Sequence, residues 1–393
     1  MFCNMLNEVT QRYVKENLSA DVRKLALKKA PAGVDLPLAL RQIEARQILQ
    51  KKVPSWSEND DLLFPVHLSI EQCSSEATAN YKSNLLKGNV FADLTGGLGI
   101  DCHFISRHFT QAHYVEMNPD LCELARHNFE VLQIPIQVWN ETSESFLSHC
   151  ETMDCIFIDP ARRDQYGRKT VSISDCTPNV VLLQQIMLER AETVMIKLSP
   201  MLDITKALNE LKNVKEVHIV AVANECKELI FILERGFEGD IRFVCSNLLS
   251  QQPQMDFSLE AEQNCNLALA DGVKRYLYEP NAAIMKGGFF KSLSKRTNTF
   301  KLHKNSNLYT SDDYVSDFPG RIFEVEGWAH YNKKMKQDFL EGVEKASIAV
   351  RNFPLSVAEL RKTLKIADGD ETYLFATTLK SEEKVLIKTK KAG

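Results

Sequence analysis

The stretch FADLTGGLGID, residues 91–101, decides the fold of this 393-residue chain. It reads as a short apolar strand ending in the acid Asp93, then a glycine-rich turn, then the start of an apolar helix. The next apolar run, AHYVEMN (112–118), carries Glu116. This order predicts a βαβ unit. Its first turn would let a ligand touch the backbone, and its second strand would present a carboxylate to ribose hydroxyls.

The glycine spacing differs from that of a dinucleotide-binding turn. Counted from Gly97, the pattern G-x-G-x-x-G requires a third glycine where Cys102 stands. Asp93 would also face the place of a pyrophosphate, and an anion is disfavoured beside another anion. We therefore expect a nucleoside ligand that carries a cationic sulfonium and no phosphate.

On these residues the sequence resembles the class I S-adenosylmethionine-dependent methyltransferases, over roughly residues 71–235. A second stretch, DCIFIDPARRD (154–164), is similar to their fourth motif, in which an acid and a proline end the fourth strand beside the methyl group. The resemblance implies S-adenosyl-L-methionine as the cofactor and an α/β, Rossmann-like sheet of seven strands. Residues 350–379 resemble the THUMP-like domain of one bacterial branch of this superfamily.

The composition indicates a globular protein, with 44% hydrophobic and 25% charged residues. No apolar run approaches the ~18–20 residues that span a bilayer, and the N-terminus lacks a secretory apolar core, so we expect a cytoplasmic protein without membrane contact. The ten cysteines form no C-x-x-C pair and the nine histidines show no ligand spacing, which predicts reduced thiols and no metal. The net charge of −4 confines any nucleic-acid contact to a local patch. The sequence is silent on oligomeric state.

Four domains are expected along the chain. A helical N-terminal domain is followed by the seven-stranded methyltransferase domain, a small α+β domain, for which a ferredoxin-like fold is one option, and the THUMP-like domain. Their predicted ranges are 1–66, 67–240, 241–320 and 321–393. The predicted strands of the methyltransferase domain are 89–94, 113–117, 136–140, 155–159, 193–198, 217–222 and 229–233, the last two forming an antiparallel hairpin at one edge.

Two segments before the first strand leave alternatives open. The N-terminal helices either pack on the core or dock substrate through a set of cations. These cations are Arg41, Arg46, Lys51 and Lys52. Residues 68–86 predict one amphipathic helix, which is either a capping helix or, by the resemblance, a segment that closes over the methionine end of the cofactor with Gln72 and Ser75 as contacts.

The resemblance also implies roles at the cofactor site. Methyl transfer from a sulfonium requires alignment of the reacting atoms and exclusion of water rather than covalent help. Asp93 would fix the loop or accept a hydrogen bond from the cofactor ammonium, and Glu116 would accept both ribose hydroxyls. Met117 would pack on the adenine, and Asn140 or Thr142 would meet its edge. The expected cofactor contacts are Asp93, Thr95, Gly96, Gly97, Gly99, Glu116, Met117, Asn140, Thr142, Gln72 and Ser75.

Asp101, in the first turn of the helix after the glycine turn, is expected chiefly to stabilise the helix dipole.

The fourth motif suggests the reaction type. Methyltransferases that act on exocyclic amines often carry two prolines and an aromatic residue here, whereas this chain has Ala161 and Arg162 after Asp159-Pro160. The ring that would stack on a base is therefore either missing or supplied from elsewhere. The expected catalytic residues are Asp159, Pro160 and Arg162. Arg162 and Arg163 suit a phosphate or carboxylate of the substrate, or else pair with nearby acids.

A fainter resemblance points to the RNA 5-methyluridine methyltransferases, which have an acid-Pro-Pro-Arg form at this motif. Those enzymes need a cysteine nucleophile, which normally follows the fifth strand. The matching stretch here is KLSP (197–200), with Ser199 in place of the cysteine. Methylation at nitrogen or oxygen, with Asp159 orienting the acceptor, is therefore favoured over methylation of a pyrimidine carbon, unless Cys176 or another thiol approaches from a loop.

The most basic stretch, residues 274–304, interleaves cations with aromatic residues, a pattern typical of contacts with phosphates and unpaired bases. Lys291, Lys295 and Arg296 are the expected substrate contacts. The alternative is a charged outer face over an aromatic core. THUMP-type domains are associated with RNA, so we expect a methyltransferase of tRNA or rRNA acting at a base nitrogen. Alternatives are a protein or small-molecule acceptor, or a non-catalytic RNA-binding protein.

Overall fold

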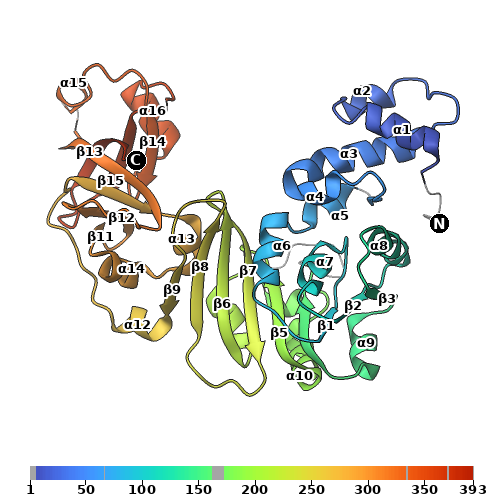
Figure 1. Cartoon of the computed structure of the whole chain (residues 1–393). Coiled ribbons are helices and arrows are strands. Elements are labelled where there is room, and N and C mark those ends of the chain that lie inside the picture. The colour runs from blue at the N-terminus through green and yellow to red at the C-terminus, as the bar shows by residue number, and fades with distance from the viewer. Residues whose placement is uncertain (1–5, 66, 162–171, 333–334, 370, 393) are drawn as a thin grey trace. The chain divides into compact units, whose positions relative to one another are not determined.

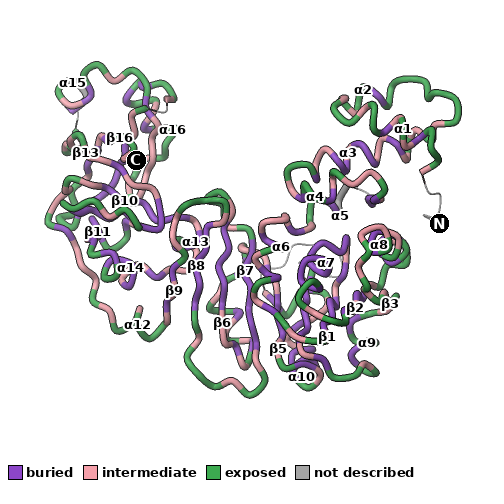
Figure 2. The backbone as a smooth tube through the Cα atoms, in the orientation of Figure 1, coloured by how far each residue is buried: buried purple, intermediate pink, exposed green. Residues whose placement is uncertain are grey.

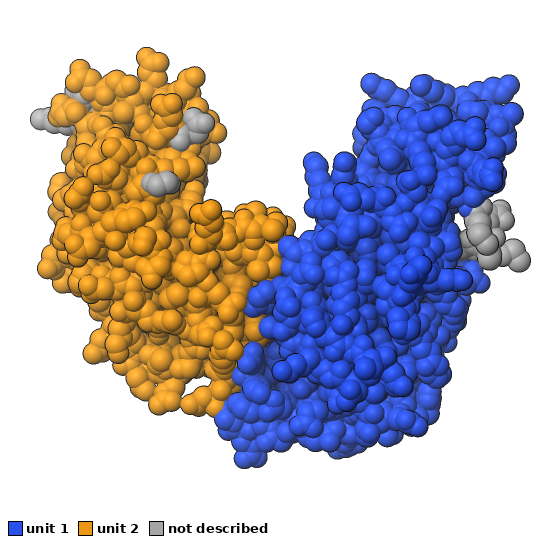
Figure 3. Space-filling view, in the orientation of Figure 1, with its two compact units in different colours: residues 1–216, 228–239 blue, residues 217–227, 240–393 orange. Residues whose placement is uncertain are grey.

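The computed structural model describes residues 6–65, 67–161, 172–332, 335–369 and 371–392. It separates into two compact units, residues 1–216 with 228–239 and residues 217–227 with 240–393 (Figure 3). Among the described helices, none combines the length and the apolar composition that crossing a bilayer requires. The finer division into four domains stays a prediction.

The first unit begins with helices, as predicted. They are α1 (Glu8–Glu16), α2 (Val22–Ala26), α3 (Leu36–Lys52) and α4 (Pro54–Ser57). Asn7, Asp21 and Asp35 each cap one of the first three helices by accepting backbone N–H groups. Arg46 is buried in α3, where it donates to the carbonyls of Asp60 and Leu62. For this arginine the packing alternative holds rather than the docking alternative.

The segment before the first strand is two helices, so the prediction of one helix over 68–86 is wrong. Helix α5 (His67–Gln72) ends, and α6 (Glu76–Ser83) begins after a break. Ser75 has an extended backbone, and its Oγ accepts the N–H of Thr78 at 3.3 Å. A serine in this role favours a helix start over helix continuation.

All seven predicted strands form. The first unit has the strand order β3-β2-β1-β4-β5-β7 (Figure 1). Neighbours from β3 to β5 are parallel, and β7 runs antiparallel to β5, so the expected strand reversal is present. The strands are β1 (Val90–Asp93), β2 (Gln111–Val115), β3 (Ile136–Trp139), β4 (Met153–Ile158), β5 (Ala191–Leu198) and β7 (Glu225–Glu234).

Helices connect these strands, and the interiors of all of them except β3 are buried (Figure 2). The connecting helices are α7 (Ile100–Ser106), α8 (Pro119–Val131), α9 (Ser143–His149), α10 (Val180–Arg190) and α11 (Ile204–Glu210), with a short 3-10 helix at Ile173–Asp175. Because parallel strands end at the same edge, the residues that follow β1, β2 and β4 are brought together. This edge holds the glycine turn, Glu116 and Asp159.

The second unit contains β6 (Val214–Val222) from Val217 onward, with β8 (Arg242–Leu248) and β9 (Met255–Ser258) following in the order β6-β8-β9. Strands β8 and β9 were not predicted from the sequence, and because they follow β6 in the strand order, the prediction that the hairpin lies at an edge is wrong. β6 leads into β7 through Ala223 and Asn224, both with positive φ, as in a tight hairpin turn.

A seven-stranded sheet in the order β11-β12-β10-β13-β16-β15-β14 completes the second unit. Its strands are β10 (Tyr276–Pro280), β11 (Phe300–His303), β12 (Ser306–Ser311), β13 (Gly320–His330), β14 (Ser347–Arg351), β15 (Tyr373–Thr378) and β16 (Lys384–Lys391). The helices are α12 (Leu259–Asn264), α13 (Ala282–Gly287), α14 (Phe290–Thr297), α15 (Met335–Asp338) and α16 (Val357–Leu364). One apolar cluster joins Leu277, Leu302, Phe323 and Phe375 across this sheet.

Candidate functional site

The glycine turn after β1 is held close against β2. A Cβ on Gly96 would lie 2.2 Å from a ring carbon of Tyr114, and Gly97 has a φ of +53°. The Tyr114 hydroxyl donates to the Gly97 carbonyl at 2.5 Å. Side chains at these two positions would therefore collide or strain the backbone, so the turn presents bare backbone to a ligand.

Glu116 joins the end of β2 to this turn. Its Oε2 accepts the N–H of Gly97 at 3.0 Å, and its Oε1 accepts the N–H of Asn118 at 2.8 Å. Asn140 donates to the backbone carbonyls of Glu116 and Met117, at 2.9 and 3.1 Å, and the Met117 side chain is exposed. The structure thus brings together four of the expected cofactor contacts, with the Glu116 carboxylate fixed by backbone donors.

Three further expected contacts have structural partners of their own. Thr142 caps α9 by accepting the N–H of Ser145, and Ser75 caps α6. Thr95 links the ends of two strands, because its N–H donates to Asp93 Oδ1 at 2.9 Å and its Oγ1 accepts the N–H of Asp159 at 2.7 Å. Gln72 is exposed at the end of α5. Their cofactor roles stay predictions.

Asp93 is the most deeply buried acid of the turn, with 1% of its surface exposed. Its Oδ2 has no hydrogen-bond partner among the described residues. Burial raises the pKa of this carboxyl well above its usual range, and the carboxylates of Asp101 and Asp159 add to the shift. An unpaired buried carboxyl oxygen beside a bare backbone turn fits a ligand that carries a positive charge, as S-adenosylmethionine does.

Asp159, directly after β4, is paired with a lysine. Lys197 Nζ lies 2.5 Å from Asp159 Oδ2, 3.2 Å from Ser74 Oγ and 3.5 Å from Asp101 Oδ2. Burial acts to lower the pKa of Lys197, but Asp159 and Asp101 outweigh burial and raise this pKa above its usual value. Lys197 is therefore a cation that donates to Ser74 and Asp159 and forms a longer ion pair with Asp101.

A second lysine extends this network into the core. Lys82 has no exposed side-chain surface, and its Nζ lies 2.8 Å from both carboxylate oxygens of Glu228. It also lies 3.1 Å from Ser74 Oγ and 3.2 Å from Asp101 Oδ1. Ser74 in turn donates to Asp101 at 2.7 Å. We name the six residues Ser74, Lys82, Asp101, Asp159, Lys197 and Glu228 the buried charge network.

Comparison with solved structures identifies the chain. A crystal structure from Porphyromonas gingivalis W83, of a protein designated a methyltransferase, matches with 34% identity and a TM-score of 0.86, and the match covers 98% of each chain. The chain belongs to the class I S-adenosylmethionine-dependent methyltransferases.

Family models match this methyltransferase in three places. Residues 75–223 match conserved hypothetical protein 95, residues 276–319 match a ferredoxin-like domain, and residues 320–391 match a THUMP-like domain. The last match confirms the predicted THUMP-like resemblance. Comparison with curated proteins finds no match.

Two other solved structures are more distant. A class I methyltransferase from Listeria monocytogenes is 12% identical, with a TM-score of 0.37, over 60% of this chain and 84% of its own. The Pyrococcus abyssi tRNA (uracil-54, C5)-methyltransferase is 13% identical, with a TM-score of 0.29, over 44% of this chain and 41% of its own. At these identities and TM-scores, neither structure indicates the substrate of this methyltransferase.

Sequence reasoning missed most of the buried charge network. Lys82 lies on an amphipathic helix, where lysine usually faces solvent. Ser74 is one residue from the Ser75 that was expected to contact the cofactor. Asp101 does lie in the first turn of α7, but it is buried and its pKa is lowered; burial opposes this shift, and Lys82 and Lys197 outweigh burial. The usable signal was KLSP, which places Lys197 at the end of the fifth strand beside Asp159.

The predicted substrate contacts of the methyltransferase are only partly described by the structure. Arg162 and Arg163 lie outside the described residues. In the second unit, Lys291 Nζ donates to the Gln263 carbonyl at 3.2 Å, while Lys295 and Arg296 are exposed on α14. The structure therefore gives Lys291 an internal partner, and its contact with substrate stays a prediction.

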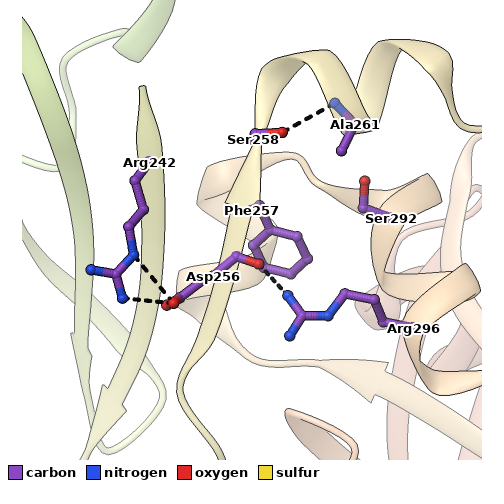
Figure 4. Close-up of a pocket in the computed structure, with 7 residues that line it drawn as sticks. All are labelled: Arg242, Asp256, Phe257, Ser258, Ala261, Ser292 and Arg296. Carbon is purple, nitrogen blue, oxygen red and sulfur yellow. Dashed lines mark hydrogen bonds and ion pairs between the residues drawn. The ribbon is translucent and has the colours of Figure 1, made fainter. Parts of the chain in front are cut away.

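A surface hollow of about 360 Å³ lies beside Arg296 (Figure 4). Arg242 reaches from β8 to the Asp256 carboxylate at 2.6 Å, and Arg296 reaches from α14 to the Asp256 carbonyl. Phe257 stacks on Phe289 with ring centroids 4.8 Å apart. Here the aromatic residues belong to a core and the cations lie at its surface, as the alternative for the basic stretch anticipates.

Proposed function

We propose that this methyltransferase modifies a nitrogen of an RNA base, in tRNA or rRNA. The observation that carries the proposal is the Asp159–Lys197 pair at the end of β4, next to the glycine turn. A carboxylate held by a protonated lysine can accept a hydrogen bond from an N–H of the acceptor. When bound, S-adenosylmethionine supplies an electrophilic methyl group.

The residues around Asp159 orient the acceptor rather than activate it chemically. Thr95 fixes the Asp159 backbone, and Lys197 fixes one carboxylate oxygen. An exocyclic amine held in this way can lose its proton after attack, so no strong base is required. The buried position of Asp93 and the bare glycine turn favour exclusion of water from the cofactor side.

The cysteines support nitrogen over carbon as the acceptor atom. Cys176 precedes Thr177, which pairs with Ala161 of the fourth motif, but its thiol is buried and donates to the Ser172 carbonyl. Cys73 lies near Lys197, yet burial raises the pKa of its thiol. A thiol that stays protonated is a poor nucleophile for a pyrimidine carbon.

RNA is favoured by the second unit. The ferredoxin-like and THUMP-like matches and the exposed cations Lys295 and Arg296 support a nucleic-acid partner. We also propose a cytoplasmic location, which is supported by the described cysteines, none of which forms a disulfide bond.

The test compares three acceptor pools. The purified protein and methyl-tritiated cofactor are incubated in three separate reactions. These contain total small RNA, protein extract or small-molecule extract, each from cells that lack the protein. We expect label in RNA alone. Label only in protein or in small molecules would replace RNA as the acceptor. No label in any pool, with cofactor binding intact, would favour a binding protein without catalysis.

A further inference from the structure

The charges in the buried charge network do not balance. Asp101, Asp159 and Glu228 contribute three carboxylates, and Lys82 and Lys197 contribute two ammonium groups, which leaves an excess of one negative charge among the described residues. Lys82 is fully buried, Asp101 and Glu228 are at most one-tenth exposed, and Asp159, with 36% of its side chain exposed, is the open end of the network. An uncompensated charge is costly in such surroundings, so the network favours a ligand with positive charge.

A second observation points to the same ligand. Asp93 Oδ2 is buried without a hydrogen-bond donor among the described residues. Asp93 is close enough to Asp101, Asp159 and Lys197 for their charges to act on its carboxyl. The unpaired oxygen and the excess negative charge therefore belong to one neighbourhood, at the carboxyl ends of β1, β4 and β5.

We propose that the buried charge network makes this site specific for the cationic, sulfonium form of the cofactor over the neutral thioether that remains after methyl transfer. The proposal rests on the proposed function, because it takes S-adenosylmethionine as the ligand. Both forms keep the ammonium and carboxylate of the methionine moiety, so the sulfonium charge alone separates them. The specificity-determining residues are Asp101, Asp159 and Glu228, with Asp93 as the unpaired acceptor.

The consequence is weak inhibition by product. Loss of the methyl group removes one positive charge from the ligand, and the network then regains its unbalanced charge. S-adenosylhomocysteine is therefore held less tightly than S-adenosylmethionine. The effect of a unit charge in a partly dry site corresponds to at least about tenfold in affinity.

Isothermal calorimetry on the full chain tests the preference for the sulfonium form without any methyl acceptor. The probes are S-adenosylmethionine, S-adenosylhomocysteine and sinefungin, in which a protonated amine replaces the sulfonium. We expect the two cationic ligands to bind at least about tenfold more tightly than S-adenosylhomocysteine, about 1.4 kcal/mol. Equal or tighter binding of S-adenosylhomocysteine would overturn the inference and leave the proposed function standing. Failure of all three to bind would overturn both.

A variant pair links the preference to the network. Glu228→Gln removes the excess charge and is expected to reduce the preference severalfold. The matched control is Glu234→Gln, on the same strand, where the carboxylate pairs with Lys215 at the surface and the preference should not change. An unchanged preference in a folded Glu228→Gln protein would contradict the role of the network. If that variant does not fold, the comparison of the three ligands on the wild-type protein still tests the preference for the sulfonium form.

Discussion

Asp93→Asn distinguishes the effect of the buried carboxyl on stability from its effect on cofactor binding. Asp93 Oδ1 accepts the N–H of Thr95, and Oδ2 is unpaired among the described residues. Asparagine can keep the first contact and cannot ionise. Because burial raises the pKa of Asp93 in the folded state, folding takes up a proton above pH ~4, where an unfolded aspartate is ionised.

The uptake of a proton on folding determines how stability changes with pH. The stability of the wild-type protein falls as the pH rises from the unfolded pKa to the raised folded pKa, by up to about 1.4 kcal/mol per pH unit. The variant lacks this loss. The free energy of unfolding of Asp93→Asn should therefore match that of the wild type near pH ~4 and exceed it by up to about 1.4 kcal/mol for each further pH unit below the folded pKa, with a corresponding rise in Tm.

Calorimetric unfolding without cofactor, at a series of pH values from 5 to 8, measures this difference. Asp203→Asn is the matched control, because Asp203 is an exposed cap of α11 and asparagine caps equally well. The variant should also bind S-adenosylmethionine more weakly, by roughly 1.5–3 kcal/mol, since it cannot provide a charged acceptor. A Tm difference between Asp93→Asn and wild type that does not grow with pH would refute the reasoning.

Three further predictions concern the cofactor, the acceptor and the RNA. Glu116→Ala should weaken cofactor binding by roughly 1.5–3 kcal/mol, and unchanged calorimetric affinity would mean that the ribose is held elsewhere. Asp159→Asn should abolish turnover and leave affinity for S-adenosylhomocysteine largely unchanged; surviving turnover would show that another group orients the acceptor. Neutralising Lys291, Lys295 and Arg296 together should flatten the salt dependence of RNA binding, whereas an unaltered slope would place the RNA on another face.

The cofactor side of the site was predictable because it is local in sequence or follows from strand order. The glycine turn and Glu116 lie within one βαβ unit. Asp159 joins them because the strand it follows, β4, is parallel to β1, and parallel strands end at a common edge. These rules place residues at an edge without knowledge of side-chain contacts.

The buried charge network was not predictable by such rules. Ser74 and Lys82 come from a helix break and the helix after it, whereas Glu228 lies on β7, 146 residues beyond Lys82 in the sequence. The break itself was missed because the apolar spacing of 68–86 continues through it, while the capping role of Ser75 depends on backbone geometry. The charge of Lys82 favours a solvent position until Glu228 is known to lie 2.8 Å away.

Mass analysis of nucleosides tests the central claim most directly. Small RNA from cells lacking the protein is incubated with the wild-type enzyme or with Asp159→Asn and with deuterium-methyl cofactor, then digested. We expect one nucleoside with the labelled methyl on a base nitrogen, present with the wild-type enzyme and missing with the variant. A labelled methyl on a pyrimidine carbon, or no labelled nucleoside while calorimetry shows bound cofactor, would contradict it.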